Sequence, residues 1–366
     1  MTALSAITRR RLEKSAEPPI RLMIVDDSQV ARAVLSRIIG THDEFEVVAL
    51  AGTAEEALDA LTTVRVDTIL LDIEMPGASG LEALPDIIRA GEGARVLIIS
   101  SMAEAGAETT VRALALGAAD ALPKPGIGNF AGRFSEVLAD RLRRIGRADR
   151  DEIPVAIAAP SGPLKLRDMP DAALGCVALG ASTGGLYALF EFLRALSGRI
   201  EAPLLVTQHL PALFMPYFAR QLESASGRIA RVAIDGESLR PDQIHVAPGD
   251  AHLCVVREGG APRVKLDRKR AASGCLPSVD PMLASIASVY GPTGIGVMLS
   301  GMGRDGLAGA RRLVECGGAM LAQDRQTAAI WGMPRGVAEA GLASAVLPPA
   351  ELARRIVQRA EAGAWR

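Results

Sequence analysis

The sequence predicts two α/β domains in one chain: an N-terminal five-stranded parallel sheet, and a C-terminal doubly wound domain with an antiparallel hairpin. Three observations support this prediction. Short apolar runs alternate with segments of helical period over residues 21–140, the alternation resumes at residue 172, and the stretch between lacks a core-facing stripe. Strands that alternate with helices favour a parallel sheet whose two faces are both covered.

The first domain, residues 21–140, contains five strand-and-helix units. The predicted strands are residues 21–25, 46–50, 68–71, 95–100 and 120–125, and the clearest helices are residues 28–40, 53–63, 80–90 and 107–117. In the first helix, Ser28 can cap the N-terminus and Gly40 can end the helix. Val30, Val34 and Ile38 fall on one face at helical spacing, which predicts an amphipathic helix.

Residues 141–171 predict an interdomain linker. The segment begins as the basic end of a helix and continues with proline, alanine and charged residues. Such composition is typical of a connection that does not pack into a core. We therefore place the second domain at residues 172–364.

The second domain returns to the same alternation of strands and helices. Its predicted strands are residues 176–180, 204–208, 295–300, 319–323 and 343–348, and helices are expected at 185–198 and 212–227. Residues 243–256 and 262–267 flank Pro-Gly-Asp and Gly-Gly turns, which predicts antiparallel hairpins on the sheet. Asp280 and Pro281 predict the N-cap and first residue of another helix.

Composition narrows the setting. The chain has 366 residues, 49% of them hydrophobic, which suits two domains that each bury a core. Its 41 basic and 42 acidic residues give a formal charge of -1, so no global field favours nucleic acid or an anionic membrane. Four scattered cysteines without a C-x-x-C pair predict a reducing, cytoplasmic setting. The N-terminus lacks the pattern of a signal peptide, and no apolar run is long enough to span a bilayer.

Polar residues follow several strands of the first domain. Asp26 and Asp27 follow the first strand, Asp72 the third, Ser100 the fourth and Lys124 the fifth. All of them are expected at the carboxyl edge of the parallel sheet. Three carboxylates there make an oxygen site suited to Mg²⁺, and one can accept a phosphoryl group. A single aspartate after a strand is most often a cap or turn former, but five matching positions favour a site.

This part of the chain resembles a response-regulator receiver, which is a flavodoxin-like domain. The motifs "VDDS", "LLDIEMPGASG", "IISS" and "PKP" carry the resemblance. It implies that a histidine kinase phosphorylates Asp72, that Asp26 and Asp27 hold Mg²⁺ together with it, and that Ser100 and Lys124 contact the phosphoryl group.

The same resemblance implies a cis bond between Lys124 and Pro125, which proline permits at low cost. The chain departs from many receivers at Ala121, three residues before the lysine, where an aromatic side chain commonly responds to phosphorylation. The phosphoryl chemistry is therefore expected, whereas the sequence does not predict the route by which phosphorylation is relayed.

The stretch "VALGASTGG" opens the second domain and has two interpretations. Gly180, Ser182 and Gly184 match the G-x-S-x-G pattern, in which small neighbours let a serine sit on a sharp strand-to-helix turn. The same letters suit a dinucleotide-binding turn, which needs an acidic residue at the end of the next strand. Gln208 and His209 stand there instead.

A serine nucleophile needs a base and a group that orients the base. Ser182, His209 and Asp305 each follow a predicted strand, so all three are expected at one edge of the sheet. Each has a structural alternative, as a helix cap or a buried histidine, but three coincidences are the less economical account. We interpret His245 and His252 as hairpin residues, because no acidic cluster with metal spacing accompanies them.

The second domain resembles the effector domain of the CheB family, the protein-glutamate methylesterases and glutamine deamidases of bacterial chemotaxis. The motifs "GASTGG", "QHLP", "APGD", "LPSVD", "SGMGRDG" and "WGMP" carry this resemblance. It implies that Ser182 attacks the receptor ester or amide, that His209 moves the proton, and that Asp305 fixes the tautomer of His209. The backbone N–H of Met302, with Thr183, is implied as the oxyanion hole, and the esterase needs no cofactor.

One position departs from this family, because Leu276 stands where arginine is expected before "PSVD". The resemblance implies methyl-accepting chemotaxis receptors as substrates and a chemotaxis histidine kinase as phosphodonor. Two domains joined by a linker lead to the hypothesis that the unphosphorylated receiver covers Ser182 and that phosphorylation relieves this inhibition. Neither nucleic acid nor membrane insertion is expected. Two other classes stay open: a phosphorylation-switched adaptor with an inactive triad, and a dinucleotide-binding reductase.

Overall fold

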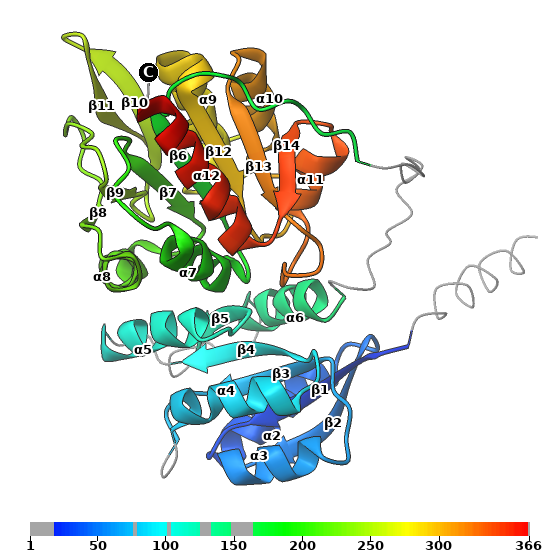
Figure 1. Cartoon of the computed structure of the whole chain (residues 1–366). Coiled ribbons are helices and arrows are strands. Elements are labelled where there is room, and N and C mark those ends of the chain that lie inside the picture. Colours follow the sequence, from blue (N-terminus) through cyan, green and yellow to red (C-terminus); the bar gives the residue numbers. More distant parts are fainter. Residues whose placement is uncertain (1–17, 76–78, 101–103, 125–132, 148–163, 365–366) are drawn as a thin grey trace, which may run out of the picture. The chain divides into compact units, whose positions relative to one another are not determined.

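The computed structural model describes residues 18–75, 79–100, 104–124, 133–147 and 164–364 (Figure 1). Two parallel sheets organise the described residues, one of five strands and one of seven, and a separate two-stranded hairpin accompanies the larger sheet.

The N-terminal sheet has the strand order β2-β1-β3-β4-β5. Its strands are β1 (Ile20–Val25), β2 (Phe45–Ala51), β3 (Thr68–Asp72), β4 (Arg95–Ser100) and β5 (Asp120–Pro123). The pairs β1/β2, β1/β3 and β3/β4 are parallel. This is the flavodoxin-like order, in which the carboxyl ends of β1 and β3 lie side by side.

The helices of this part follow the strands as predicted. They are α2 (Gln29–Ile39), α3 (Ala54–Leu61), α4 (Gly80–Ala90), α5 (Glu104–Ala115) and α6 (Arg133–Gly146). Helix α2 packs with α6 and β1, whereas α3 packs with α4 and β2. The predicted fold class of the first domain is therefore confirmed.

Helix α2 begins and ends where the sequence predicts, but a different face is buried. Ser28 Oγ accepts a hydrogen bond from the Ala31 amide at 3.2 Å, and Gly40 is the C-cap. The buried residues are Leu35 and Ile39, whereas Val30 is 73% exposed. Leu35 and Ile39 are four residues apart and therefore lie on the same face of the helix. This face packs against the sheet, whereas the predicted face of Val30, Val34 and Ile38 does not.

Helix α6 extends past residue 141, where the linker was expected to begin, and ends at Gly146. Leu142 and Ile145 are fully buried, so the basic end of this helix still packs against the domain. Residues 164–171, the described end of the predicted linker, contain neither helix nor strand.

The C-terminal sheet has the order β14-β13-β12-β6-β7-β9-β8, and all of its pairs are parallel. Its strands are β6 (Cys176–Ala181), β7 (Leu204–Gln208), β8 (Ala230–Val232), β9 (Ile244–Val246), β12 (Gly294–Met298), β13 (Ala319–Gln323) and β14 (Ala343–Leu347). Strand β6 lies between β7, which follows it in the chain, and β12, which comes much later in the chain. In open α/β sheets, such a switch point opens a crevice at the carboxyl ends of the strands.

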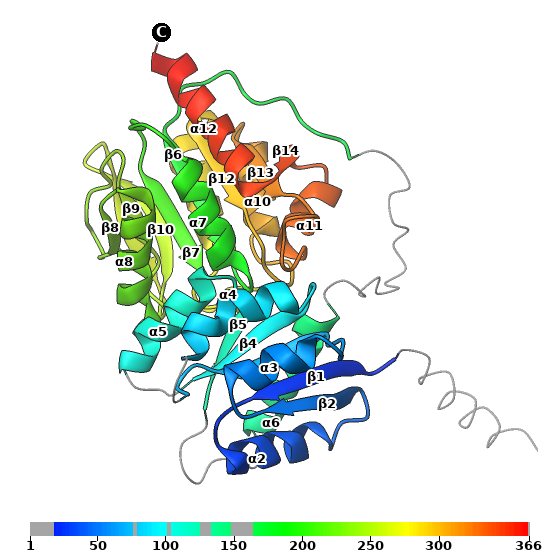
Figure 2. The ribbon, with the colours of Figure 1, turned by 60° about the horizontal axis from the view of Figure 1, so that its bottom comes forward.

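Helices cover both faces of this sheet, which makes the domain doubly wound. They are α7 (Gly185–Ala195), α8 (Met215–Ser226), α9 (Val279–Tyr290), α10 (Leu307–Glu315), α11 (Met333–Glu339) and α12 (Pro349–Ala364), with the short helices η1 (Ala212–Phe214) and η2 (Gly291–Thr293). Helix α7 packs with α8 and α12, and α10 packs with α9 and α11 (Figure 2). No helix of the described residues combines the length and apolar character needed to cross a bilayer.

The region predicted as hairpins divides between two sheets. Strands β10 (His252–Glu258) and β11 (Ala261–Asp267) form an antiparallel hairpin that packs on α9, so His252 lies in a hairpin as predicted. The placement of His245 was wrong, because β9 joins the large sheet parallel to β7 and β8. The Pro-Gly-Asp turn therefore connects two sheets and does not close a hairpin.

The start of α9 also differs from the prediction. Ser278 is the N-cap and Val279 the first helical residue, so Asp280 lies inside the first turn. The Asp280 carboxylate instead accepts a hydrogen bond from the Gly309 amide at 2.8 Å, which ties α9 to α10.

Candidate active site

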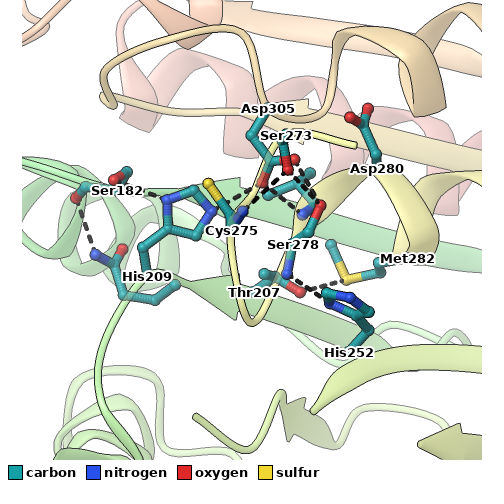
Figure 3. A network of polar contacts seen from close by, with 12 residues as sticks. Ser182, Thr207, His209, His252, Ser273, Cys275, Ser278, Asp280, Met282 and Asp305 are labelled. Atoms are coloured by element: carbon teal, nitrogen blue, oxygen red, sulfur yellow. Dashed lines mark hydrogen bonds and ion pairs between the residues drawn. The ribbon is translucent and has the colours of Figure 1, made fainter. Parts of the chain in front are cut away.

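Three polar side chains meet at the switch point of the seven-stranded sheet (Figure 3). Ser182 directly follows β6, His209 directly follows β7, and Asp305 lies in the loop between β12 and α10. Ser182 Oγ is 3.0 Å from His209 Nδ1, and His209 Nε2 is 2.8 Å from Asp305 Oδ2. The structure therefore brings together the three residues that the sequence singles out.

The backbone around Ser182 is held on several sides. Its amide donates to the Ser300 carbonyl at 2.9 Å, and its carbonyl accepts from the Gly185 amide at 2.8 Å and from Gln208 Nε2 at 2.9 Å. Gly184 has φ of 71°, a left-handed conformation that a residue with Cβ rarely adopts. The turn thus fixes Ser182 at the end of β6 and starts α7 directly after it.

Asp305 is buried and accepts hydrogen bonds on both oxygens. Oδ2 accepts from the Val279 amide at 2.8 Å as well as from His209, and Oδ1 accepts from Ser278 Oγ at 2.6 Å. The Ser278 amide in turn donates to His252 Nδ1 at 2.9 Å. The start of α9 therefore orients the carboxylate that faces the histidine.

The electrostatics of this cluster favour a charged pair. Burial lowers the pKa of the His209 imidazole, but hydrogen bonds to Asp305 and Cys275 raise it more, to about 9. Burial raises the pKa of Asp305, but hydrogen bonds from His209, Ser278 and the Val279 amide hold it at about 2. Asp305 is thus an acceptor at neutral pH and stabilises a proton on the histidine.

The segment after β12 approaches Ser182 closely. A Cβ added at Gly301 would lie 2.9 Å from the Ser182 Cβ, so the close approach requires glycine here. Met302 follows, and Gly303 has φ of 83°. Among the described residues, neither the Met302 amide nor the Thr183 amide donates a hydrogen bond. Both N–H groups are therefore free to serve an anion near Ser182.

A second polar cluster lies at the carboxyl edge of the five-stranded sheet. One oxygen each from Asp26, Asp27 and Asp72 lies within 4.8 Å of the others. Lys124 Nζ is 2.6 Å from Asp72 Oδ2 and 3.2 Å from Asp26 Oδ2. Asp26 Oδ2 is buried, and Lys124 is its ion-pair partner among the described residues. A set of three neighbouring carboxylates offers oxygen ligands alone, which fits Mg²⁺.

Burial and the ion pair between Asp72 and Lys124 shift the pKa values of both groups in opposite directions. Burial raises the pKa of Asp72 above its ordinary value, although the hydrogen bond from Lys124 opposes the rise. Burial lowers the pKa of Lys124, but Asp72 and Asp26 raise it more. Lys124 is therefore held as a cation beside the carboxylate.

Two predictions for this edge lie partly outside the described residues. Ser100 ends β4, but its side chain is not among the described parts. The bond between Lys124 and Pro125 also lies outside the described residues. Ala121 lies in β5 as the sequence predicts.

Sequence reasoning gave no role to four residues that surround the triad. They are Gln208, Ser278, His252 and Cys275. Gln208 donates to the Ser182 carbonyl, and Ser278 donates to Asp305. His252 accepts from the Ser278 amide, and Cys275 Sγ lies beside His209 and Asp305. Two of them could have been found from the sequence, because Gln208 and Ser278 lie within the motifs "QHLP" and "LPSVD" that carry the family resemblance.

The fold and the two clusters are those of a response regulator joined to an α/β enzyme domain. Comparison with known proteins makes this specific: residues 177–356 match the CheB methylesterase family and residues 22–129 match the response regulator receiver domain. The chain belongs to the CheB methylesterase family and carries a receiver domain.

The relatives extend over nearly the whole chain. A protein-glutamate methylesterase/protein-glutamine glutaminase of Caulobacter vibrioides is 41% identical over 93% of this chain and 99% of its own. One of Paramagnetospirillum magneticum is 38% identical over 94% of this chain and 97% of its own. The crystal structure of the Thermotoga maritima CheB methylesterase catalytic domain matches at 34% identity with a TM-score of 0.50, covering 51% of this chain and 99% of that one.

Proposed function

We propose that the chain hydrolyses methyl esters of glutamate side chains on chemoreceptors, and deamidates specific glutamines, under the control of phosphorylation at Asp72. One observation carries the proposal: a hydrogen-bonded series from Ser182 Oγ through His209 to Asp305 at the switch point of the sheet. The relatives named above, which carry both activities in their names, support it.

In the first half of the reaction, Ser182 Oγ attacks the ester or amide carbonyl carbon and His209 Nδ1 accepts the serine proton. Asp305 stabilises the imidazolium that forms. The Met302 and Thr183 N–H groups donate to the oxyanion, each contribution being typically about 3 kcal/mol. His209 then passes its proton to the departing methanol or ammonia, which leaves an acyl ester on Ser182.

In the second half, His209 accepts a proton from water, and the hydroxide attacks the acyl ester. The serine oxygen leaves with the proton from His209, so the products are a free glutamate side chain and the restored Ser182 hydroxyl. Apart from the substrate and water, this half of the proposed reaction uses only groups of the chain.

Phosphorylation uses the cluster of the five-stranded sheet. An Asp72 oxygen accepts the phosphoryl group from a histidine kinase, Lys124 neutralises part of its charge, and Ser100 contacts it. Asp26, Asp27 and Asp72 would hold Mg²⁺, which supplies further positive charge when bound. The pairing of Lys124 with Asp72 at 2.6 Å supports this assignment.

We assign the receiver to residues 21–140, the linker to 141–171, of which 141–146 form the end of α6, and the effector to 172–364. The matched ranges, 22–129 and 177–356, support this division. The partners are chemoreceptors and a chemotaxis histidine kinase in the cytoplasm, without nucleic acid or membrane insertion.

The test measures methanol released from receptor membranes that carry labelled methyl esters. Wild type and Ser182→Ala are compared, each with and without Mg²⁺ plus a small phosphodonor. We expect release that requires Ser182 and rises with the phosphodonor. Release that ignores the donor would contradict the switch but keep the enzyme, and no release would favour the adaptor with an inactive triad.

The dinucleotide-binding alternative has no support. Gln208 stands where the ribose-binding acid is needed, and its side chain is engaged with the Ser182 carbonyl at 2.9 Å.

A further inference from the structure

Cys275 is a cysteine that the proposed hydrolysis does not use. It is partly exposed, and Figure 3 shows its sulfur beside the His209 ring. One ligand atom each from His209, Cys275 and Asp305 lies within 4.8 Å of the others. Three side chains of three different chemistries, a thiol, an imidazole and a carboxylate, thus converge on one point at the mouth of the site.

We propose that His209, Cys275 and Asp305 form a binding site for a soft or borderline divalent cation of the Zn²⁺ class, which inhibits the enzyme by occupying His209. Sulfur, nitrogen and oxygen ligands together are typical of zinc. The carboxylate cluster of the five-stranded sheet differs, because it offers oxygen alone and suits Mg²⁺.

The separations require only a small adjustment. Zinc bonds of about 2.0 to 2.3 Å place tetrahedral ligand atoms about 3.3 to 3.7 Å apart. His209 Nε2 and Asp305 Oδ2 are already 2.8 Å apart, and the remaining distances in the cluster do not exceed 4.8 Å. Cys275 follows Gly274, which has φ of 76° and open space around it, so its side chain can approach the other two.

Surrounding groups hold the ligands as outer-shell partners do in metal sites. Ser278 Oγ donates to Asp305 Oδ1 at 2.6 Å, and the Val279 amide donates to Oδ2 at 2.8 Å. The Cys275 amide donates to Ser273 Oγ at 3.3 Å, which fixes the loop that carries the thiol. Ser182 Oγ lies 3.0 Å from the other ring nitrogen, Nδ1, so Ser182 is not one of the proposed ligands.

Inhibition follows from the chemistry of the imidazole ring. As the cation binds, the Cys275 thiol and His209 Nε2 each release a proton to solvent, and the Nε2 lone pair binds the cation. With the cation on one ring nitrogen, the other must carry the proton of the neutral ring. His209 then cannot accept the proton of Ser182. This inhibition depends on the proposed function, whereas cation binding does not.

The binding test uses the full chain, with Mg²⁺ in excess to occupy the carboxylate cluster. Co²⁺ serves as the spectroscopic probe for Zn²⁺, because a thiolate bound to Co²⁺ absorbs in the near ultraviolet. We expect this band in wild type and in the matched control Cys316→Ser, and its loss in Cys275→Ser. Zn²⁺ should displace Co²⁺, and Cys275→Ser should weaken Zn²⁺ binding by at least about tenfold.

A second measurement follows ester hydrolysis against Zn²⁺. Wild type should be inhibited and recover with a chelator, whereas Cys275→Ser should need at least about ten times more Zn²⁺. Absence of the thiolate band in wild type, or its survival in Cys275→Ser, overturns the proposal. If wild type shows the band but hydrolyses no ester, the cation site stands and the proposed function fails.

Discussion

His209 presents its ring in the reverse of the familiar serine-protease arrangement. There Nε2 faces the serine and Nδ1 faces the aspartate. Here Nδ1 faces Ser182 and Nε2 faces Asp305. The proton of the neutral ring is therefore on Nε2, donated to Asp305, and the Nδ1 lone pair points at the serine hydroxyl. Either nitrogen serves as a base, so the reversal changes the tautomer but not the chemistry.

The pH dependence of hydrolysis reports this histidine. Only the neutral ring accepts the serine proton, and Asp305 and Cys275 raise the pKa of His209 to about 9. We therefore expect kcat/KM to increase with pH through a midpoint near 9, and to fall below it. Methanol release at pH 6 to 10, corrected with Ser182→Ala for spontaneous hydrolysis, measures the profile. A midpoint at 6.5, the ordinary pKa of histidine, would contradict the raised pKa of His209.

Gly301 sets the distance between two segments of the site. In Gly301→Ala the new methyl group would clash with Met333 Sδ and would lie 2.9 Å from the Ser182 Cβ. Even if the Met333 side chain moves away, the methyl group and Ser182 must separate. We expect kcat to fall by about 100-fold, the effect of displacing a reacting group by about 1 Å.

The control for Gly301→Ala is Gly336→Ala, in helix α11. Its added Cβ meets only Leu307, at 3.8 Å, and alanine favours a helix interior over glycine. Equal activity of the two variants would refute the steric account.

At the scale of the elements, helix α9 supports the catalytic geometry from its N-terminus. Ser278 is its N-cap, but its hydroxyl donates to Asp305 and makes no capping bond. The Val279 amide, one of the N-terminal amides that have no partner inside the helix, donates to Asp305 as well. A long-range carboxylate thus replaces the local cap, and the helix and the site stabilise each other.

Ser278→Ala should reduce both stability and turnover. It leaves a buried oxygen of Asp305 without a donor, which costs about 1 to 3 kcal/mol. The folded pKa of Asp305 is about 2 against an ordinary 3.8, so this contribution is full above pH 3.8 and lost as pH falls through 2. Urea unfolding at neutral pH measures it.

Ser273→Ala is the control, because Ser273 is exposed and contacts Ser278 without touching Asp305. If both variants unfold at the same urea concentration, the hydrogen bond from Ser278 to Asp305 contributes no more to the free energy of unfolding than the contact with Ser273.

The elements also show what the sequence could and could not predict. The meeting of Ser182, His209 and Asp305 was predictable, because carboxyl ends of neighbouring parallel strands share an edge. The pairing of β9 was not, because this strand has three residues and its partners are distant in the chain. The start of α9 was missed for a related reason, since Ser278 bonds Asp305, 27 positions away.

At the scale of the whole molecule, the chain combines two polar clusters of different character. One is an all-carboxylate cluster with a lysine, and the other is a serine, histidine and aspartate. The first suits phosphoryl transfer and the second acyl transfer. The two chemistries can therefore be removed separately.

Asp72→Asn should abolish stimulation by a small phosphodonor, because the amide oxygen is a poor nucleophile. The measurement is the ratio of methanol release with and without donor, expected to be about one in the variant. Asp59→Asn, an exposed aspartate on α3, is the control and should keep the wild-type ratio. If Asp72→Asn is still stimulated by the phosphodonor, the residue that accepts the phosphoryl group is not Asp72.

The order in which the chain supplies its triad has a consequence for biosynthesis. Asp305 is separated from His209 by 96 positions, and both supporting groups from α9 also come after the histidine. A ribosome must therefore release most of the effector domain before the serine has a working base. A chain that ends before β12 lacks Asp305, the charge partner of His209, and therefore lacks the complete triad.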